Sequence, residues 1–182
     1  MARAGEHIEK PVTGERVIFR ATTAETGGAL LSMDYFAPPH HVIAPPHVHP
    51  RQEERTEVLA GTLSGRVGGR KRTLQAGESV TVPAGTMHGF RNAAAVELHT
   101  VVEFRPALRT EIVFETFVAL ARAGKTNARG MPSLLHTAVL THEYLDEVGL
   151  PLLPLGLQRA LLGPLAAIGR RRGYQPSAGS VR

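Results

Sequence analysis

The stretch PPHVHPRQEERTEVLAGTL, residues 45–63, places two histidines one residue apart and follows them with two adjacent glutamates. On a β-strand, side chains two positions apart point to the same face, at a separation of roughly 6.6 Å along the strand axis. His47 and His49 are therefore expected to aim into one cavity, where their spacing suits two ligands of one metal ion. Glu54, which a turn or bulge separates from His49, can add a carboxylate.

A third imidazole has to come from elsewhere, and the segment GESVTVPAGTMHGFRN, residues 77–92, supplies His88. Three imidazoles and one carboxylate suit one divalent transition metal (Fe, Mn, Ni, Co, Cu or Zn) and leave positions for water or substrate. The chain has no cysteine, which excludes disulfides, thiolate ligands and a cysteine nucleophile. The sequence thus predicts a metal site with these ligands: His47, His49, Glu54 and His88.

Short strands dominate the first part of the chain. Between residues 15 and 104, apolar or alternating runs are broken by Gly and Pro at intervals of about ten residues. Such spacing indicates an antiparallel β-sandwich or β-barrel. Gly68 and Gly69 separate two of these runs and favour a hairpin turn, because glycine tolerates positive φ.

The two histidine segments together resemble the cupin family. The first motif of that family has the form G-x5-H-x-H-x(3,4)-E-x6-G, which is matched here by His47, His49, Glu54 and Gly61. The second has the form G-x5-P-x-G-x2-H-x3-N, which is matched at every fixed position, by Gly77, Pro83, Gly85, His88 and Asn92. The resemblance covers approximately residues 15–106 and implies a mainly β fold, a small bacterial jelly-roll β-barrel similar to the barrel of quercetinases.

One position departs from the first motif. Its leading glycine falls at position 41, where this chain has His41, preceded by His40. These histidines either are ordinary polar side chains on a loop or reach the mouth of the cavity, and the sequence leaves their role open. Glu53 competes with Glu54 for the carboxylate position, but Glu54 leaves the six-residue gap to Gly61 that the motif has.

After Pro106 the apolar periodicity becomes helical, with helices expected in residues 107–126, 131–149 and 155–173. Pro164 is expected to kink or split the last of them. We therefore expect a cupin β-barrel domain at residues 1–106 and a helical C-terminal extension at residues 107–182 that packs on the barrel and ends in a flexible tail.

The apolar segment at residues 149–169 has three interpretations. It packs across the barrel, covers the barrel mouth as a lid for a hydrophobic substrate, or lies on a membrane surface with Arg170–Arg172 at its polar end. Packing is the favoured interpretation, because the segment lacks the strongly charged polar face of an interfacial anchor.

Two residues outside the predicted ligand set are candidates for catalysis, Tyr35 and His99. Tyr35 and Met33 lie two positions apart and are expected on the same face of a strand. If that face lines the cavity, Tyr35 can orient or protonate a substrate. Packing in the core or at a subunit interface is the alternative. His99 is a candidate acid–base group, but a single histidine on a strand is more often hydrogen-bonded or exposed.

The composition excludes several classes of function. The 182 residues are 42% hydrophobic and 20% charged, and no apolar run approaches the roughly 18 residues of a membrane-spanning helix. The formal charge of +5 does not form one face, and the chain has no Trp and only three Tyr for base stacking. The first residues lack the apolar core of a secretory signal. We expect a cytoplasmic protein with a small-molecule substrate, without a nucleic-acid partner or a membrane span.

Cupin folds host several activities, so the fold alone does not choose among them. The first hypothesis is a metal-dependent dioxygenase, similar to quercetinase-type cupins, that acts on a small, partly apolar, enol- or phenol-like molecule. Glu54 would either stay a ligand or accept a proton. A Lewis-acid isomerase, cyclase or lyase and a non-catalytic small-molecule-binding cupin are the alternatives. Similar cupins commonly dimerise, so a homodimer is expected.

Overall fold

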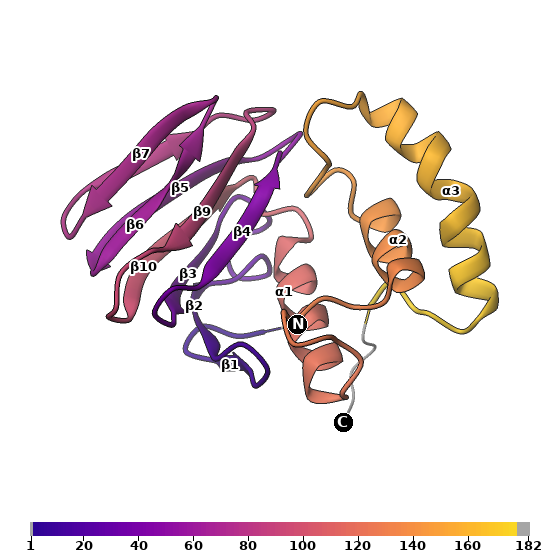
Figure 1. The fold of residues 1–182 in the computed structure, drawn as a ribbon, viewed down its shortest axis with the longest axis horizontal. Helices are drawn as coiled ribbons and strands as arrows, with labels where there is room; N and C mark the ends of the chain where they lie inside the picture. The colour runs from indigo at the N-terminus through magenta and orange to yellow at the C-terminus, as the bar shows by residue number, and fades with distance from the viewer. Residues whose placement is uncertain (1, 178–182) are drawn as a thin grey trace.

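The computed structural model describes residues 2–177, which form ten strands followed by three helices (Figure 1). The strands are β1 His7–Lys10, β2 Glu15–Ala21, β3 Leu31–Ala37, β4 Val42–His47, β5 Glu53–Ala60, β6 Thr62–Val67, β7 Arg70–Gln75, β8 Ser79–Val82, β9 His88–Asn92 and β10 Leu98–Arg105. The helices are α1 Thr110–Arg122, α2 Leu134–Glu143 and α3 Leu155–Arg171. In these residues no helix is both long and apolar enough to cross a membrane.

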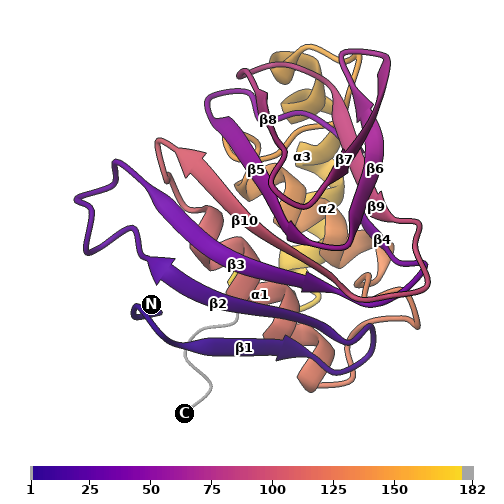
Figure 2. The same cartoon turned by 90° about the vertical axis from the view of Figure 1, so that its left-hand side faces the viewer.

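The strands form two antiparallel sheets. One sheet has the order β1-β2-β3-β10-β5-β8 and the other the order β4-β9-β6-β7. In Figure 2 the smaller sheet stands at an angle to the larger one, and the helices lie behind both. The mainly β fold class, with helices in the C-terminal part, is confirmed.

The core lies between the sheets because the strands alternate between buried and exposed positions. In β2, for example, Val17 and Phe19 are buried whereas Ile18 and Arg20 are less so. The largest fully buried apolar side chains on the strands are Phe19, Leu31, Met33, Leu63 and Leu98. Most of the interior between the two sheets is therefore filled by apolar side chains.

The hairpin expected at Gly68 and Gly69 joins β6 to β7, and both glycines have positive φ, +56° and +80°. Beside it, β6 and β9 approach closely at Gly65. A Cβ added to Gly65 would lie 2.2 Å from the carbonyl oxygen of Gly89. A side chain at position 65 would thus push β9, which begins with His88, away from β6.

Helix α1 lies where residues 107–126 predict it, and Gly124, with φ of +67°, follows its end. Phe114 of α1 packs with ring centroids 6.4 Å from both Tyr35 and Phe104, two residues of the six-stranded sheet. Helix α1 therefore packs on a part of the larger sheet that the smaller sheet does not cover, and it extends the apolar core there (Figure 2).

Helix α3 continues through Pro164, so this proline does not split the helix, and the kink that was expected as the other effect stays a prediction. Pro164 and Ala160 are both exposed. The carbonyl of Ala160, which loses its intrahelical donor, can therefore bond to water.

Helix α3 packs against α2 through its small residues. Gly169 is buried, and a Cβ there would lie 2.6 Å from Cγ2 of Val139. Four larger apolar side chains of α3 are exposed instead: Leu157, Leu161, Leu165 and Ile168. The flexible tail expected at the end of the chain includes residues 178–182, which lie outside the described residues.

Candidate metal centre

Four side chains from both sheets converge at one end of β4. His47 is the last residue of β4, Glu54 lies in β5 and His88 is the first residue of β9, while His49 lies in the loop after β4. Their potential ligand atoms all lie within 4.8 Å of one another. The Nε2 atoms of His47 and His49 are 3.0 Å apart, and Oε2 of Glu54 is 3.1 Å from Nε2 of both His49 and His88.

Strand register and a buried loop produce this convergence. His47 and His88 are direct partners in the β4–β9 ladder, so their side chains share a face. In the loop that crosses to the other sheet, Gln52 is fully buried and its Nε2 donates to the carbonyls of Pro106 and Ala107. The side chain of Gln52 thus fixes the path of the chain between His49 and Glu54.

All three imidazoles use Nδ1 in the same way. Nδ1 of His47 lies 2.9 Å from the carbonyl oxygen of Pro45, and Nδ1 of His88 lies 2.9 Å from that of Thr86. Nδ1 of His49 lies 2.5 Å from the carbonyl oxygen of Glu147. A carbonyl oxygen can only accept, so each Nδ1 carries the proton. This tautomer leaves every Nε2 facing the centre of the cluster.

The donor set and spacing fit one metal ion. Metal–ligand bonds of about 2.1 Å at right angles place neighbouring ligand atoms about 3.0 Å apart, close to the spacing of 3.0 and 3.1 Å found here. With each Nδ1–H bonded to a carbonyl, either an additional proton or a cation has to lie between the Nε2 atoms. Three imidazoles and one carboxylate suit the divalent transition metals from Mn to Zn.

The charges inside the cluster are strongly coupled. Burial raises the pKa of Glu54, but hydrogen bonds and charge interactions with His49 and His88 outweigh burial and hold it well below its usual range. Burial lowers the pKa of His88, but the contact with Glu54 outweighs this and raises it. Burial, followed by repulsion from His49 and His88, lowers the pKa of His47 to about 4. The cluster thus holds an anionic carboxylate beside at least one neutral imidazole near neutral pH.

Glu54, and not its neighbour Glu53, is the carboxylate of the cluster. Glu54 is buried and Glu53 is exposed, as the alternation along β5 requires. Thr56, two positions further along the same strand, donates from Oγ1 to Oε1 of Glu54 at 3.0 Å. This bond leaves Oε2 directed at the two histidines.

The structure places Tyr35 away from the four-residue cluster. Its hydroxyl donates to Oε1 of the buried Glu15, which also accepts from Lys10 and Thr13 through Oε2. Nε2 of His41 lies 3.4 Å from the same carboxylate. Tyr35 and His41 therefore belong to a second polar cluster, beside the start of β4, whereas His47 ends that strand.

The structure places His99 on the opposite face of β10 from the buried Thr100 and Phe104. Its ring stacks on Phe36 at 4.2 Å, and its Nε2 lies 2.7 Å from Oδ1 of Asp34. The side chain of His99 is thus held on the outer surface of the sheet and is not brought to the cluster.

Sequence reasoning missed three residues that support the cluster. Thr56 could have been found from its two-residue spacing to Glu54. Gln52 gives no local signal, because a polar residue in a turn is normally exposed. Glu147 is 98 positions from His49, and no periodicity connects them.

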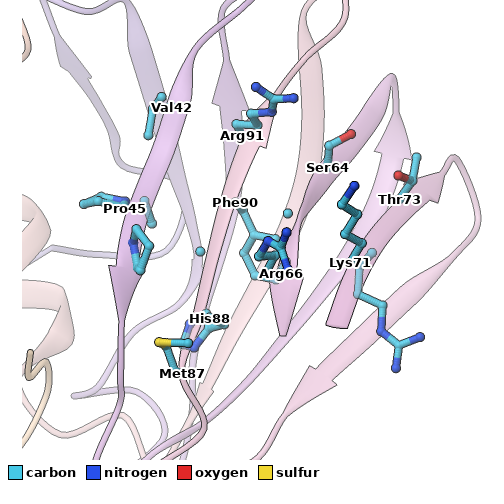
Figure 3. Close-up of a pocket in the computed structure, with 15 residues that line it drawn as sticks. Val42, Pro45, Ser64, Arg66, Lys71, Thr73, Met87, His88, Phe90 and Arg91 are labelled. Atoms are coloured by element: carbon cyan, nitrogen blue, oxygen red, sulfur yellow. The ribbon is translucent and has the colours of Figure 1, made fainter. Parts of the chain in front are cut away.

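A surface depression of about 530 Å³ lies on the four-stranded sheet. Figure 3 shows the cationic side chains of Arg66, Lys71 and Arg91 around it, with Met87 and His88 at one end. His88 is the one cluster residue that lines the depression, and only 1% of its surface is exposed. The depression therefore does not expose the cluster to solvent.

Comparisons with known proteins agree with the motifs. Residues 35–102 match the family model described as Cupin domain, and the matched segment includes all four cluster residues. Oxalate oxidase 1 of Hordeum vulgare is 38% identical over 68 residues, which cover 33% of this chain and 34% of the relative. Oxalate oxidase GF-2.8 of Triticum aestivum is also 38% identical, over 33% of this chain and 30% of its own. The chain thus spans about a third of the length of these curated relatives.

Among solved structures, an RmlC-like cupin from Shewanella frigidimarina is 21% identical, with a TM-score of 0.49, over 58% of this chain and 87% of its own. KdgF from Halomonas sp. is 25% identical, with a TM-score of 0.45, over 50% of this chain and 78% of its own.

Proposed function

We propose that this chain, which belongs to the cupin superfamily, is a metal-dependent dioxygenase that acts on a small, partly apolar, enol- or phenol-like organic molecule. One observation carries the proposal. Three imidazoles, each with Nδ1 bonded to a backbone carbonyl, direct Nε2 into one cluster that also contains the buried carboxylate of Glu54. Burying four such groups together is costly unless a cation satisfies them.

His47, His49, Glu54 and His88 would hold one divalent transition ion. The ion would supply a Lewis-acidic, redox-active centre with positions open to substrate and dioxygen. Thr56 holds Oε1 of Glu54, so Oε2 would either stay a ligand of the ion or leave it to accept the proton of a substrate hydroxyl. A carboxylate with a depressed pKa is a weak base, so this transfer requires a hydroxyl that is itself acidic, as in an enol or phenol.

The surroundings of the cluster favour a partly apolar substrate. The ring of Phe104 lies 5.2 Å from that of His49, and the ring of Phe90 lies 5.7 Å from that of His88. Of the four cluster residues, His47 is the least buried, so substrate would approach from its side. The names of the curated relatives, oxalate oxidases, support an oxidative reaction. Oxalate itself carries two negative charges, which these aromatic surroundings do not match.

Oxygen uptake tests this proposal. The purified protein would be loaded separately with each of the six candidate metals and assayed with a series of enols and phenols, with oxalate for comparison. Uptake that depends on substrate, and is lost in His88→Ala, is the expected result. Turnover without oxygen uptake, supported by Zn, would replace the dioxygenase with a Lewis-acid isomerase, cyclase or lyase. Ligand binding without turnover would indicate a non-catalytic cupin.

The homodimer stays a prediction. Leu152 is 91% exposed, and the exposed leucines of α3 continue from it along the helix. Sedimentation velocity of the purified protein measures the oligomeric state directly, and a single species with the mass of one chain would exclude a stable dimer.

A further inference from the structure

The segment between α2 and α3 contacts the candidate metal centre. The carbonyl oxygen of Glu147 lies 2.5 Å from Nδ1 of His49. Beside this contact, Val48 and Gly149 form a two-bond bridge, with N–O distances of 3.1 Å from the Val48 amide and 2.9 Å from the Gly149 amide. These three hydrogen bonds join the segment between α2 and α3 to Val48 and His49.

His49 is the one imidazole of the cluster that depends on a distant segment. His47 and His88 each bond through Nδ1 to the carbonyl two residues earlier, that of Pro45 and that of Thr86. Those acceptors lie two residues before their histidines, that of Pro45 in β4 and that of Thr86 in the loop before β9, so the barrel supplies both. The acceptor for His49 comes from 98 residues further along the chain.

The Glu147 side chain holds its own backbone in place. Glu147 is 3% exposed, and its Oε1 accepts from the main-chain amide of Arg109 at 3.2 Å and from Nε of Arg109 at 2.9 Å. The same guanidinium donates to the carbonyl oxygen of Glu143 at 2.6 Å. Arg109, directly before α1, therefore fixes the chain from position 143 to position 147.

Helix α3 holds the other side of the segment. Gln158 is 1% exposed and its Oε1 accepts from the amide of Leu150 at 2.8 Å. Its Nε2 donates to the carbonyls of Leu150 and Leu153 at 3.0 and 2.6 Å. The chain around Gly149 is thus held from both sides, which fixes the position of the Glu147 carbonyl.

We propose that Glu147 is a positioning residue of the metal centre: its carbonyl keeps the proton of His49 on Nδ1 and directs Nε2 toward Glu54, and its carboxylate, bound to Arg109, keeps that carbonyl in place. The inference rests on the proposed function for the identity of the metal centre. An acceptor at Nδ1 orients a histidine ligand and increases its basicity, and loss of such a partner typically lowers metal affinity about 10–100-fold.

The first test uses the metal-free protein. Long-range 1H–15N correlation spectra of the histidine rings report which nitrogen carries the proton. In the wild type, Nδ1 of His49 is expected to carry a proton, in addition to any proton that its Nε2 shares with Nε2 of His47. In Glu147→Ala, which removes the contact with Arg109, the Nδ1 signal of His49 is expected to shift toward a mixture of tautomers, while the signals of His47 and His88 stay in place.

The second test measures affinity and geometry with Co(II) as the probe. Glu147→Ala is expected to bind Co(II) about 10–100-fold more weakly, with an altered d–d absorption spectrum. Glu147→Gln keeps an acceptor for the Arg109 amide and is expected to restore most of the affinity. Glu143→Gln is the matched control. Glu143 is also an ion-pair partner of Arg109, but its side chain is 33% exposed, so this substitution removes the same charge at a more exposed position.

The outcomes separate this inference from the proposed function. If Glu147→Ala keeps the wild-type spectrum, affinity and His49 tautomer, Glu147 does not position His49. If the wild type binds no metal but Glu147→Ala still changes the His49 tautomer, the positioning role stands and the metal centre fails. Should Glu147→Ala not fold, Arg109→Gln removes the same ion pair from its more exposed side and is expected to weaken Co(II) binding likewise.

Discussion

The Nε2 atom of His47 lies 3.0 Å from the Nε2 atom of His49, and each ring already donates its Nδ1–H to a backbone carbonyl. Two neutral rings in this arrangement would face each other with lone pairs. A proton or a cation between them removes the repulsion. Burial, followed by repulsion from His49 and His88, lowers the pKa of His47 to about 4, so this ring is neutral at neutral pH and its Nε2 lone pair is free to bind a cation.

Metal binding is therefore expected to stabilise the fold. A metal at about 100 times its dissociation constant adds about 2.7 kcal/mol to the free energy of unfolding if it binds only the folded protein. For a chain of this size, that corresponds to a rise of about 5–11 °C in Tm. Differential scanning calorimetry of the chelated and the metal-loaded protein checks this. An unchanged Tm with every one of the six metals would contradict the account.

Glu54→Gln is expected to weaken metal binding at least about 10-fold, because the amide cannot replace the anionic oxygen between His49 and His88. Glu53→Gln is the matched control: it makes the same substitution one position earlier, on an exposed side chain. Competition with a coloured chelator measures both affinities. Equal losses in the two variants would show that net charge, and not the position of the carboxylate, controls binding.

Gly65→Ala is expected to destabilise the fold by about 1–3 kcal/mol, because the added Cβ would meet the Gly89 carbonyl at 2.2 Å and the Phe90 ring at 2.7 Å. Gly156→Ala in α3 meets no atom within 4 Å and is expected to stabilise by about 0.4–1 kcal/mol. Urea denaturation of both variants gives the comparison. A neutral effect of Gly65→Ala would mean that β6 and β9 are not packed as closely as described.

Glu15→Gln is expected to remove part of the acid sensitivity of the fold. Burial raises the pKa of Glu15, but the Lys10 charge and hydrogen bonds from Lys10, Thr13 and Tyr35 outweigh burial and lower it below 4.5. The ionised Glu15 therefore contributes stability above pH 4.5, which is lost as the pH falls through the lower, folded-state pKa.

The variant should consequently be less stable than the wild type near neutral pH, and the difference should shrink on acidification below the unfolded pKa. Urea titrations across this pH range measure the free energy of unfolding at each pH. A difference that stays constant or grows toward low pH would contradict the sign of the shift.

Local spacing was sufficient to predict the barrel part of the site. The patterns around His47 and Glu54 indicate which side chains meet, although His49 lies in the loop after β4 and not on the strand that its two-residue spacing from His47 assumed. The hairpin at Gly68 and Gly69 and the helix ended by Gly124 follow equally local rules, because each depends on backbone preferences of adjacent residues.

Contacts between distant segments could not be predicted in this way. The position of the Glu147 carbonyl beside His49 depends on the packing of the two helices that precede it. A backbone acceptor can belong to any residue type, so the sequence pattern does not indicate it. The face of α3 that packs on α2 could not be predicted from the sequence either. Its leucines follow a helical period, but the pattern does not show that Gly169 and other small residues pack on α2 while the leucines stay exposed.

The most direct test of the central claim is the amount of metal bound per chain, measured by inductively coupled plasma mass spectrometry on protein without a histidine tag. The account predicts about one equivalent of one transition metal in the wild type and in His99→Ala, whose ring lies on the outer face of its sheet, and loss of that metal in His47→Ala and His88→Ala. Absence of metal from the wild type, even after reconstitution with Mn, Fe, Co, Ni, Cu and Zn, would contradict it.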